Sequence, residues 1–299
     1  MASGLAAGLR SLIEGELDRD PGPRARAMAE KLAARPGVAA VLFYGAQMRD
    51  EAAGGGGGPL DFYLLTDSNI AYHGAGLSAA ANYLLPPNVY YERIDESPPI
   101  EAKVAVATLA AFRARMRPDA LDTTFWARFA QPVILVWSRG PAEREAVVDA
   151  VSTAVETAAW WGSRFAPAEA DTEAFWSALF THTYGSELRV ESGGRVQQLM
   201  AAAPGRYQRI HEWLAEAVDQ PERRRAATAW RRRAALGKFR NLARLTKAAF
   251  TYRGGFAYAL SKVERHSGKA VELAPWQRRW PWLAAPFVLW RLWREKRLK

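Results

Sequence analysis

The chain has 299 residues, of which 49% are hydrophobic, so it can bury a sizeable core in one large or two modest domains. It contains no cysteine, which excludes disulfides, thiolate metal sites and a cysteine nucleophile. The N-terminal residues lack the apolar run of a signal peptide, and no stretch reaches the about 18 apolar residues of a spanning helix. We therefore expect a protein without transmembrane helices.

The net charge of +10 is unevenly distributed along the chain. Residues 222–299 contain 21 Lys and Arg but 4 Asp and Glu, a balance of +17, whereas residues 1–221 carry −7. A basic C-terminal third on an acidic body predicts an anionic partner for that third. Membrane lipid and nucleic acid are the two candidates.

The hydrophobic pattern predicts an α/β core followed by helices. Residues 1–35 have leucines at helical spacing and predict one or two amphipathic helices. Apolar runs predict strands at 41–44, 60–65, 88–94, 102–108 and 132–136, with a helix at 109–115. Further helices are predicted at 146–161, 173–184 and 206–213, and a long basic helix after residue 222.

The most informative stretch, residues 41–67, has two apolar runs separated by glycines. The first ends at Tyr44-Gly45, a turn where the backbone can approach a phosphate group closely. The second carries Asp61 near its start and Asp67 just past its end. A carboxylate in an apolar strand needs a partner, because burying an unpaired charge is costly. Mg²⁺ suits this position, since it prefers oxygen ligands and bridges to substrate phosphates; a β-hairpin with a polar edge is the alternative.

This stretch resembles the mitochondrial-type phosphatidate cytidylyltransferases (the translocator assembly and maintenance protein family) of the nucleotidyltransferase superfamily. In that family the turn reads Tyr-Gly-Ser-Gly, and the second strand reads Leu-Asp-Phe with an Asp after it. The matching residues are Tyr44, Gly45, Leu60, Asp61, Phe62 and Asp67. Ala46 and Gln47 replace the Ser and Gly of the turn, and Tyr63 stands where the superfamily usually has a second Asp.

Further short matches follow in the family's order and cover residues 41–136 well and the remainder loosely. Tyr72-His73 lies where the family has Trp-His, and Val89-Tyr90-Tyr91 matches its Val-Tyr-Tyr. Lys103 matches the family's strand lysine. Arg128 matches an arginine that precedes Pro-Val, and Arg189 matches a later arginine. Several short matches at preserved spacings are more specific than any one of them.

The resemblance implies a role for each matching residue. Asp61, Lys103 and His73 would be catalytic, and Asp61 with Asp67 would bind Mg²⁺, the implied cofactor. CTP would contact Tyr44, Gly45, Ala46, Lys103, Arg128 and Arg189, and Glu101 is a candidate third carboxylate. Each residue also has an ordinary structural explanation. Asp61 could cap the end of a strand, and Asp67 could be the N-cap of a helix. Lys103 could be a lysine at a sheet edge, His73 a structural histidine, and Arg128 and Arg189 partners in surface salt bridges.

The implied fold is α/β, with a nucleotidyltransferase-like mixed sheet and flanking helices in residues 1–138. A helical domain would follow in 139–220, and a basic, Trp-rich helical region in 221–299. The implied enzyme converts CTP and phosphatidate to CDP-diacylglycerol and pyrophosphate in phospholipid biosynthesis. Two alternatives stay open: a nucleotidyltransferase with a soluble or RNA acceptor, and an inactive homologue serving as a membrane adaptor. Association into a homo-oligomer is also open.

The last 24 residues contain five of the twelve tryptophans, among apolar and basic residues. Trp prefers the headgroup region of a bilayer, and a basic amphipathic helix lies in the interface plane. We expect this region to bind an anionic membrane surface, at the cytoplasmic face of the cell membrane, through Trp282, Phe287, Leu289, Trp290 and Trp293. Core packing of the tryptophans is one alternative. Nucleic-acid binding is the less favoured one, because no recognised reader motif appears.

Overall fold

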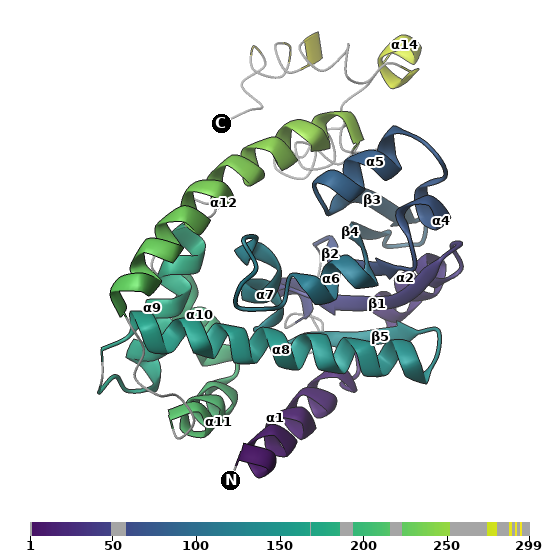
Figure 1. Ribbon diagram of the computed structural model, residues 1–299. Helices are drawn as coiled ribbons and strands as arrows, with labels where there is room; N and C mark the ends of the chain where they lie inside the picture. The colour runs from purple at the N-terminus through teal and green to yellow at the C-terminus, as the bar shows by residue number, and fades with distance from the viewer. Residues whose placement is uncertain are drawn as a thin grey trace.

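The computed structural model describes residues 2–48, 58–167, 169–185, 194–215, 223–251 and 274–279, together with 287, 288, 291 and 294. These residues form an α/β fold in which helices flank a five-stranded mixed sheet (Figure 1). The strands are β1 (Val38–Tyr44), β2 (Leu60–Thr66), β3 (Asn88–Ile94), β4 (Ile100–Thr108) and β5 (Ile134–Ser138). The predicted α/β class and the five strand positions are confirmed.

The strand order of the sheet is β3-β4-β2-β1-β5. β1 runs antiparallel to both β2 and β5, and β3 runs antiparallel to β4, whereas β2 and β4 are parallel. The connection from β2 to β4 contains α4 (Asn69–His73), α5 (Leu77–Leu84) and β3. Because β2 and β4 are parallel and β1 is antiparallel to β2, the first residues of β2 and β4 lie at the same end of the sheet as the last residues of β1.

Helices cover both faces of the sheet. α2 (Pro23–Ala33) packs on one face, over a core that contains Phe43, Phe62 and Val104. The other face is covered by α1 (Ala2–Leu17), α6 (Leu109–Ala114), α7 (Thr123–Phe129) and α8 (Pro141–Phe165). Successive residues of a strand point to opposite faces. The candidate residues Tyr44 and Asp61 therefore lie on the α7 side, opposite to their neighbours Phe43 and Phe62.

The helices after the sheet share its core. α9 (Thr172–Gly185), α10 (Gly194–Ala202) and α11 (Pro204–Ala215) follow α8. One cluster of buried side chains extends from Leu42 of the sheet through Val151 of α8 to Trp176 of α9 and Tyr207 of α11. This core is therefore continuous across residue 138, where a domain boundary was predicted. The boundaries at 138 and 220 stay predictions.

The long helix α12 (Arg223–Thr251) arches from the neighbourhood of α9 to that of α5, and the short helix α14 (Pro275–Arg279) lies beyond it (Figure 1). Three basic residues of α12 donate hydrogen bonds to groups of the body. Arg233 donates to the carbonyls of residues 118–120, Arg244 to Pro86 O and the carboxylate of Asp122, and Lys247 to the carbonyls of residues 85 and 87. Part of the basic charge of the C-terminal third is thus bound within the chain.

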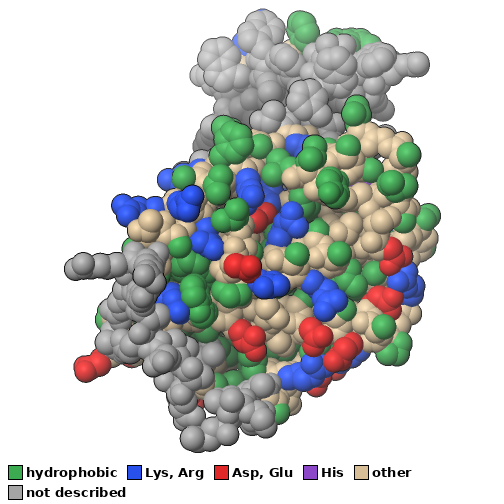
Figure 2. Space-filling view, in the orientation of Figure 1, with side chains coloured by type: hydrophobic (Ala, Val, Ile, Leu, Met, Phe, Trp, Pro, Cys, Tyr) green, Lys and Arg blue, Asp and Glu red, His purple; other side chains and the backbone are tan. Residues whose placement is uncertain are grey.

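The surface reflects this distribution of charge. Figure 2 shows Lys and Arg side chains gathered below α12, whereas acidic and basic side chains alternate near α8. Along α8 they form ion pairs, such as Arg144 with Asp18 at 2.7 Å. Among the described residues, no helix is long and apolar enough to cross a membrane.

Membrane association stays a prediction. Phe287, one of the residues predicted to contact lipid, is 63% exposed. Trp282, Leu289, Trp290 and Trp293 lie outside the described residues.

Replacing Arg244 with Met is expected to lower the free energy of unfolding by about 2–3 kcal/mol, because it removes the closest cationic partner of the buried Asp122 carboxylate and leaves Arg115 at 3.7 Å. Burial alone would raise the pKa of Asp122, but the charge and hydrogen bond of Arg244 outweigh burial and hold that pKa below its usual value. This stabilisation is therefore complete above the unfolded-state pKa and is lost as the pH falls through the folded-state pKa. The variant should lose less stability in acid than the wild type.

Urea unfolding at neutral pH and in acid measures both effects. Arg231→Met is the matched control, because Arg231 lies on the same helix and donates only an exposed hydrogen bond to Thr228 among its described contacts. An equal loss of stability in the two variants would contradict the anchoring role of Arg244.

Candidate functional site

The candidate site lies where the end of β1 meets the starts of β2 and β4. The register of β1 with β2 pairs Tyr44 with Asp61, and that of β2 with β4 pairs Asp61 with Lys103. Residues directly opposite each other in a sheet point to the same face. The three side chains therefore stand in one row across three strands, and all three are half-buried. We refer to them as the Tyr44–Asp61–Lys103 row.

Gly45 makes the turn at the end of this row. Its φ of +92° lies in the left-handed region that favours glycine. A Cβ at this position would lie 3.0 Å from Oδ2 of Asp61, so the missing side chain leaves room for the carboxylate beside the backbone. Ala46 follows and begins a helical turn at 46–48.

Gln47 ties the two ends of the glycine-rich connection together. Its Oε1 accepts a hydrogen bond from the backbone N–H of Gly58 at 3.3 Å. On the other side, Arg24 of α2 donates to the carbonyl of Gly58 at 3.4 Å. Gln47, which replaces the second glycine of the family's turn, thus holds the far end of the connection beside the turn. Residues 49–57 lie outside the described residues.

Arg128 brings a positive charge to the end of β1. It lies in the last turn of α7, and its Nη1 donates to the hydroxyl of Tyr44 at 3.3 Å. Its guanidinium lies 5.2 Å from the centroid of the Tyr44 ring, within range of a cation–π contact. α7 starts at the N-cap Asp122 and packs Phe125 and Phe129 into the core, which fixes this position.

Glu101 and Tyr91 extend the same face onto β4 and β3. Tyr91 is the register partner of Lys103, and Glu101 precedes Lys103 by two residues, so both point to the face of Asp61. The hydroxyl of Tyr91 donates to Oε1 of Glu101 at 2.5 Å. From strand spacing and rise, the Cα atoms of Glu101 and Asp61 are about 8 Å apart. Two carboxylate side chains at this separation can converge on one cation.

Tyr63 follows Asp61 by two residues in β2, so the two side chains share one face of the sheet. The Tyr63 side chain is 4% exposed. Its ring packs against Phe112, Phe125 and Phe129, with centroid distances of 6.2, 5.6 and 5.0 Å. Burial raises the pKa of its hydroxyl far above the usual range. An aromatic core therefore fills the space beside Asp61 on this face.

Asp67 is not brought to the site. It follows the far end of β2, six residues and about 20 Å from Asp61. Its carboxylate forms two hydrogen bonds with Arg139, at 2.6 and 2.8 Å, and these hold the pKa of Asp67 below its usual value. One Mg²⁺ ion cannot contact both aspartates. Of the two described acidic candidates to accompany Asp61, Glu101 and not Asp67 has the required position.

His73 lies on the other face of the sheet. Its Nδ1 is 3.1 Å from the hydroxyl of Tyr90, which points away from the face of Tyr91 because the two are neighbours in β3. Burial, reinforced by the charge of Lys247, lowers the pKa of His73 to about 4, so the ring is neutral at pH 7. The structure thus separates His73 from the row. Arg189, another predicted site residue, lies outside the described residues.

The row and its neighbours bring together two carboxylates, a lysine and an arginine, which are the groups that a nucleoside triphosphate with a divalent cation would require. Within the described part of the chain, no group of three or more His, Cys, Asp and Glu could hold a metal ion by itself. Mg²⁺ commonly takes one or two carboxylates and completes its shell with water and substrate phosphates. Asp61 and Glu101 would meet that requirement, and Lys103 and Arg128 are the cationic side chains on the same face. The hydrogen bond between Tyr91 and Glu101 was not predicted from the sequence, although the alternation of side chains along a strand places both on this face.

Gly45→Ala is expected to destabilise the protein by about 1–2 kcal/mol through its positive φ, and further through the contact with Asp61. Gly74→Ala is the matched control: Gly74 has a φ of +72°, but a Cβ there would meet nothing within 4 Å. Urea unfolding should show the larger loss of stability in Gly45→Ala. Identical behaviour of the two variants would contradict the close packing of Gly45 on Asp61.

His73 is expected to titrate with a midpoint of about 4, well below an exposed histidine. Because the folded-state pKa is lowered, neutral His73 contributes stability above its unfolded-state pKa, and this stability is lost as the pH falls toward 4. NMR titration of the imidazole carbons, assigned with His73→Gln, measures the midpoint. A midpoint near 6.5 would show that the ring is not buried as described.

Comparison with known proteins adds no family assignment to this geometry: neither a protein-family model nor a curated protein matches the chain.

Proposed function

We propose that this protein is a Mg²⁺-dependent nucleotidyltransferase that transfers the cytidylyl group of CTP to phosphatidate, giving CDP-diacylglycerol and pyrophosphate. One observation carries the proposal. The sheet register gathers Tyr44, Asp61 and Lys103 on one face, beside the turn at Gly45. These are among the residues in which the sequence resembles the phosphatidate cytidylyltransferases, and they come from three different strands. Their convergence is what a shared nucleotide site requires.

Each residue of the site has a distinct task in this proposal. Asp61 and Glu101 would hold Mg²⁺, which offsets the negative charge of the triphosphate and of the departing pyrophosphate. Lys103 would bind phosphate oxygens as a point charge, and Arg128 would present its planar guanidinium to them. Tyr44, hydrogen-bonded to Arg128, fixes the direction of that guanidinium.

The reaction is a displacement at phosphorus. An oxygen of the phosphatidate phosphate forms a bond to the α-phosphorus of CTP, while the bond from that phosphorus to the β-phosphate bridging oxygen breaks. A phosphate monoester is already anionic at neutral pH, so the attacking oxygen needs no general base. A neutral His73 on the opposite face is compatible with this chemistry. The protein's contribution is therefore positioning and charge neutralisation.

Action on a lipid also requires contact with a membrane, which we propose for the C-terminal third. Leu236, Phe239 and Leu242 of α12 are 38%, 70% and 56% exposed and recur at helical spacing. Lys238 is exposed beside them. A basic helix with exposed apolar side chains suits the surface of an anionic bilayer. The cytoplasmic face of the cell membrane, where CTP is available, is the proposed location.

Pyrophosphate release tests the proposal. Purified protein with CTP, Mg²⁺ and vesicles containing phosphatidate should release pyrophosphate, and Asp61→Asn should lower the rate by about 100-fold or more, because a metal ligand is lost. Asp67→Asn is the matched control, because it makes the same substitution just past the far end of β2. It should remove only the ion pair with Arg139 and keep most of the rate.

Each other outcome has a definite meaning. Turnover that does not require phosphatidate would indicate a soluble or RNA acceptor. CTP binding without turnover would also point to a different acceptor, and absence of CTP binding would leave an inactive membrane adaptor. Equal rates for Asp61→Asn and Asp67→Asn would refute the site itself.

A further inference from the structure

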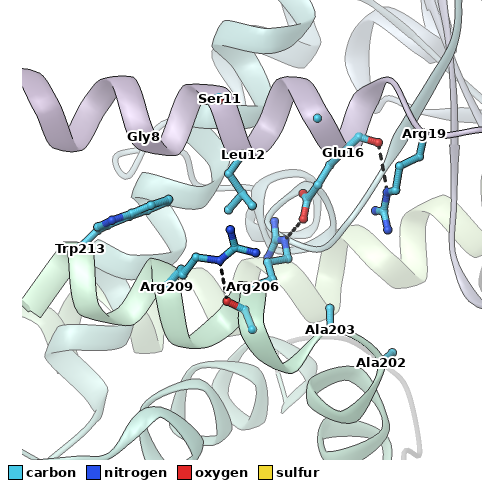
Figure 3. A pocket seen from close by; sticks show the side chains of 12 residues that line it. Gly8, Ser11, Leu12, Glu16, Arg19, Ala202, Ala203, Arg206, Arg209 and Trp213 are labelled. Atoms are coloured by element: carbon cyan, nitrogen blue, oxygen red, sulfur yellow. Dashed lines mark hydrogen bonds and ion pairs between the residues drawn. The ribbon is translucent and has the colours of Figure 1, made fainter.

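A cleft with a volume of about 650 Å³ lies between α1 and α11 (Figure 3). Its floor contains the buried side chains of Glu16 and Arg206, and Arg19 and Arg209 stand at its rim. This volume is within the range of sites for small organic ligands. None of these residues belongs to the Tyr44–Asp61–Lys103 row, so the cleft is a separate feature of the molecule.

The floor of the cleft has hydrogen-bonding groups that the described residues leave unused. Arg206 is 4% exposed, and its Nε donates to Oε1 of Glu16 at 2.7 Å. Its two terminal nitrogens, Nη1 and Nη2, are buried without a hydrogen-bond partner among the described residues, as is Oε2 of Glu16. Buried guanidinium donors are seldom left unpaired, because their lost hydration is not replaced. Oxygen atoms of a bound molecule would supply the acceptors that are absent here.

The charge of the cleft favours a dianion. Arg19, Arg206 and Arg209 carry three positive charges, and Glu16 carries one negative charge, which leaves about +2. In Figure 3 the guanidinium groups of Arg206 and Arg209 extend from α11 toward α1. Nε of Arg209 donates to the carbonyl of Gly205 at 3.1 Å, which holds the guanidinium group at the exposed rim. A phosphate monoester carries about two negative charges at neutral pH and so matches this balance.

The other end of the cleft is apolar. Leu12 and Trp213 line it, and both are half-buried. Trp213 approaches α1 closely at Gly8, where a Cβ would lie 3.3 Å from the indole ring. The absence of a side chain at Gly8 therefore lets the indole pack against the helix. An aromatic wall next to a cationic floor suits a molecule with an anionic group and a flat apolar group.

We propose that this cleft binds a phosphate monoester carrying a small apolar or aromatic group. The phosphate would meet Arg206 and Arg209, and the apolar group would pack on Leu12 and Trp213. A free metabolite and a lipid headgroup share this phosphate chemistry. The proposal does not depend on the transferase activity proposed above.

Gly15 offers a variant that closes the cleft without changing its charge. It lines the cleft from α1, and a Cβ there would meet nothing within 4 Å. Gly15→Leu would fill this space, while Gly15→Ala makes the same backbone change and adds one methyl group. Both substitutions favour the helix, since glycine is the weaker helix former, so neither should unfold the protein. Replacing Arg206 itself would leave Glu16 unpaired and is the less informative variant.

Titration calorimetry of the full chain with phenyl phosphate tests the proposal. We expect wild type, Gly15→Ala and Lys103→Met to bind it, the last because the row at Lys103 is elsewhere. Gly15→Leu should bind at least about tenfold more weakly, as should Arg209→Gln, which removes a charged hydrogen-bond donor. Inorganic phosphate should bind more weakly than phenyl phosphate, because it cannot contact Trp213.

The source of the ligand is decided by a second titration with the short-chain lipid dihexanoyl phosphatidate. Tighter binding of this lipid than of phenyl phosphate would assign the cleft to a lipid headgroup, and weaker binding would assign it to a soluble metabolite. Absence of phenyl phosphate binding to the wild type, or equal binding to Gly15→Leu, would overturn the proposal. Benzoate binding as tightly as phenyl phosphate would overturn the preference for a dianion.

Discussion

The candidate site depends on the register of β2 against β4. This register places Asp61 beside Lys103 and, through β1 and β3, adds Tyr44 and Tyr91 to the same face. A slip of one residue would turn the face of one strand over and put Val104 in the place of Lys103. The register is held because Val104 is buried with Phe62 in the core under α2. Packing on one face of the sheet therefore determines the chemistry on the other.

Two buried ion pairs tie late helices to early parts of the chain. Arg244 of α12 pairs with Asp122, and Arg206 of α11 pairs with Glu16 of α1. A buried ion pair adds little net stability compared with apolar packing, but breaking one is costly, so such pairs select one arrangement of helices over others. The pair at Arg244 also accounts for part of the uneven charge along the sequence. Part of the positive charge of the C-terminal third serves to dock α12 on the body, and only the remaining part is available to an outside partner.

Local patterns predicted the elements better than they predicted the site. Apolar runs located all five strands, although β1 begins three residues before the predicted position, where two alanines gave no clear strand signal. Asp61 and Lys103 were found because their neighbours in sequence are apolar. Asp67 was expected to share a metal ion with Asp61. Its actual partner, Arg139, is 72 residues away and cannot be inferred from a local pattern. The face on which His73 lies likewise follows from its contact with Tyr90, which only the folded sheet reveals.

Tyr63 limits the number of carboxylates that the site can contain. Its ring is part of an aromatic cluster directly next to Asp61, and a carboxylate in that place would be buried among phenyl rings without a partner. The described residues therefore offer Asp61 and Glu101, and the remaining ligands of a bound Mg²⁺ would have to come from water and from the nucleotide. In such a site the metal and the nucleotide complete each other's binding, so each should bind more tightly in the presence of the other. The low-dielectric cluster beneath the row would also strengthen the attraction of a bound nucleotide's phosphates to Lys103 and Arg128.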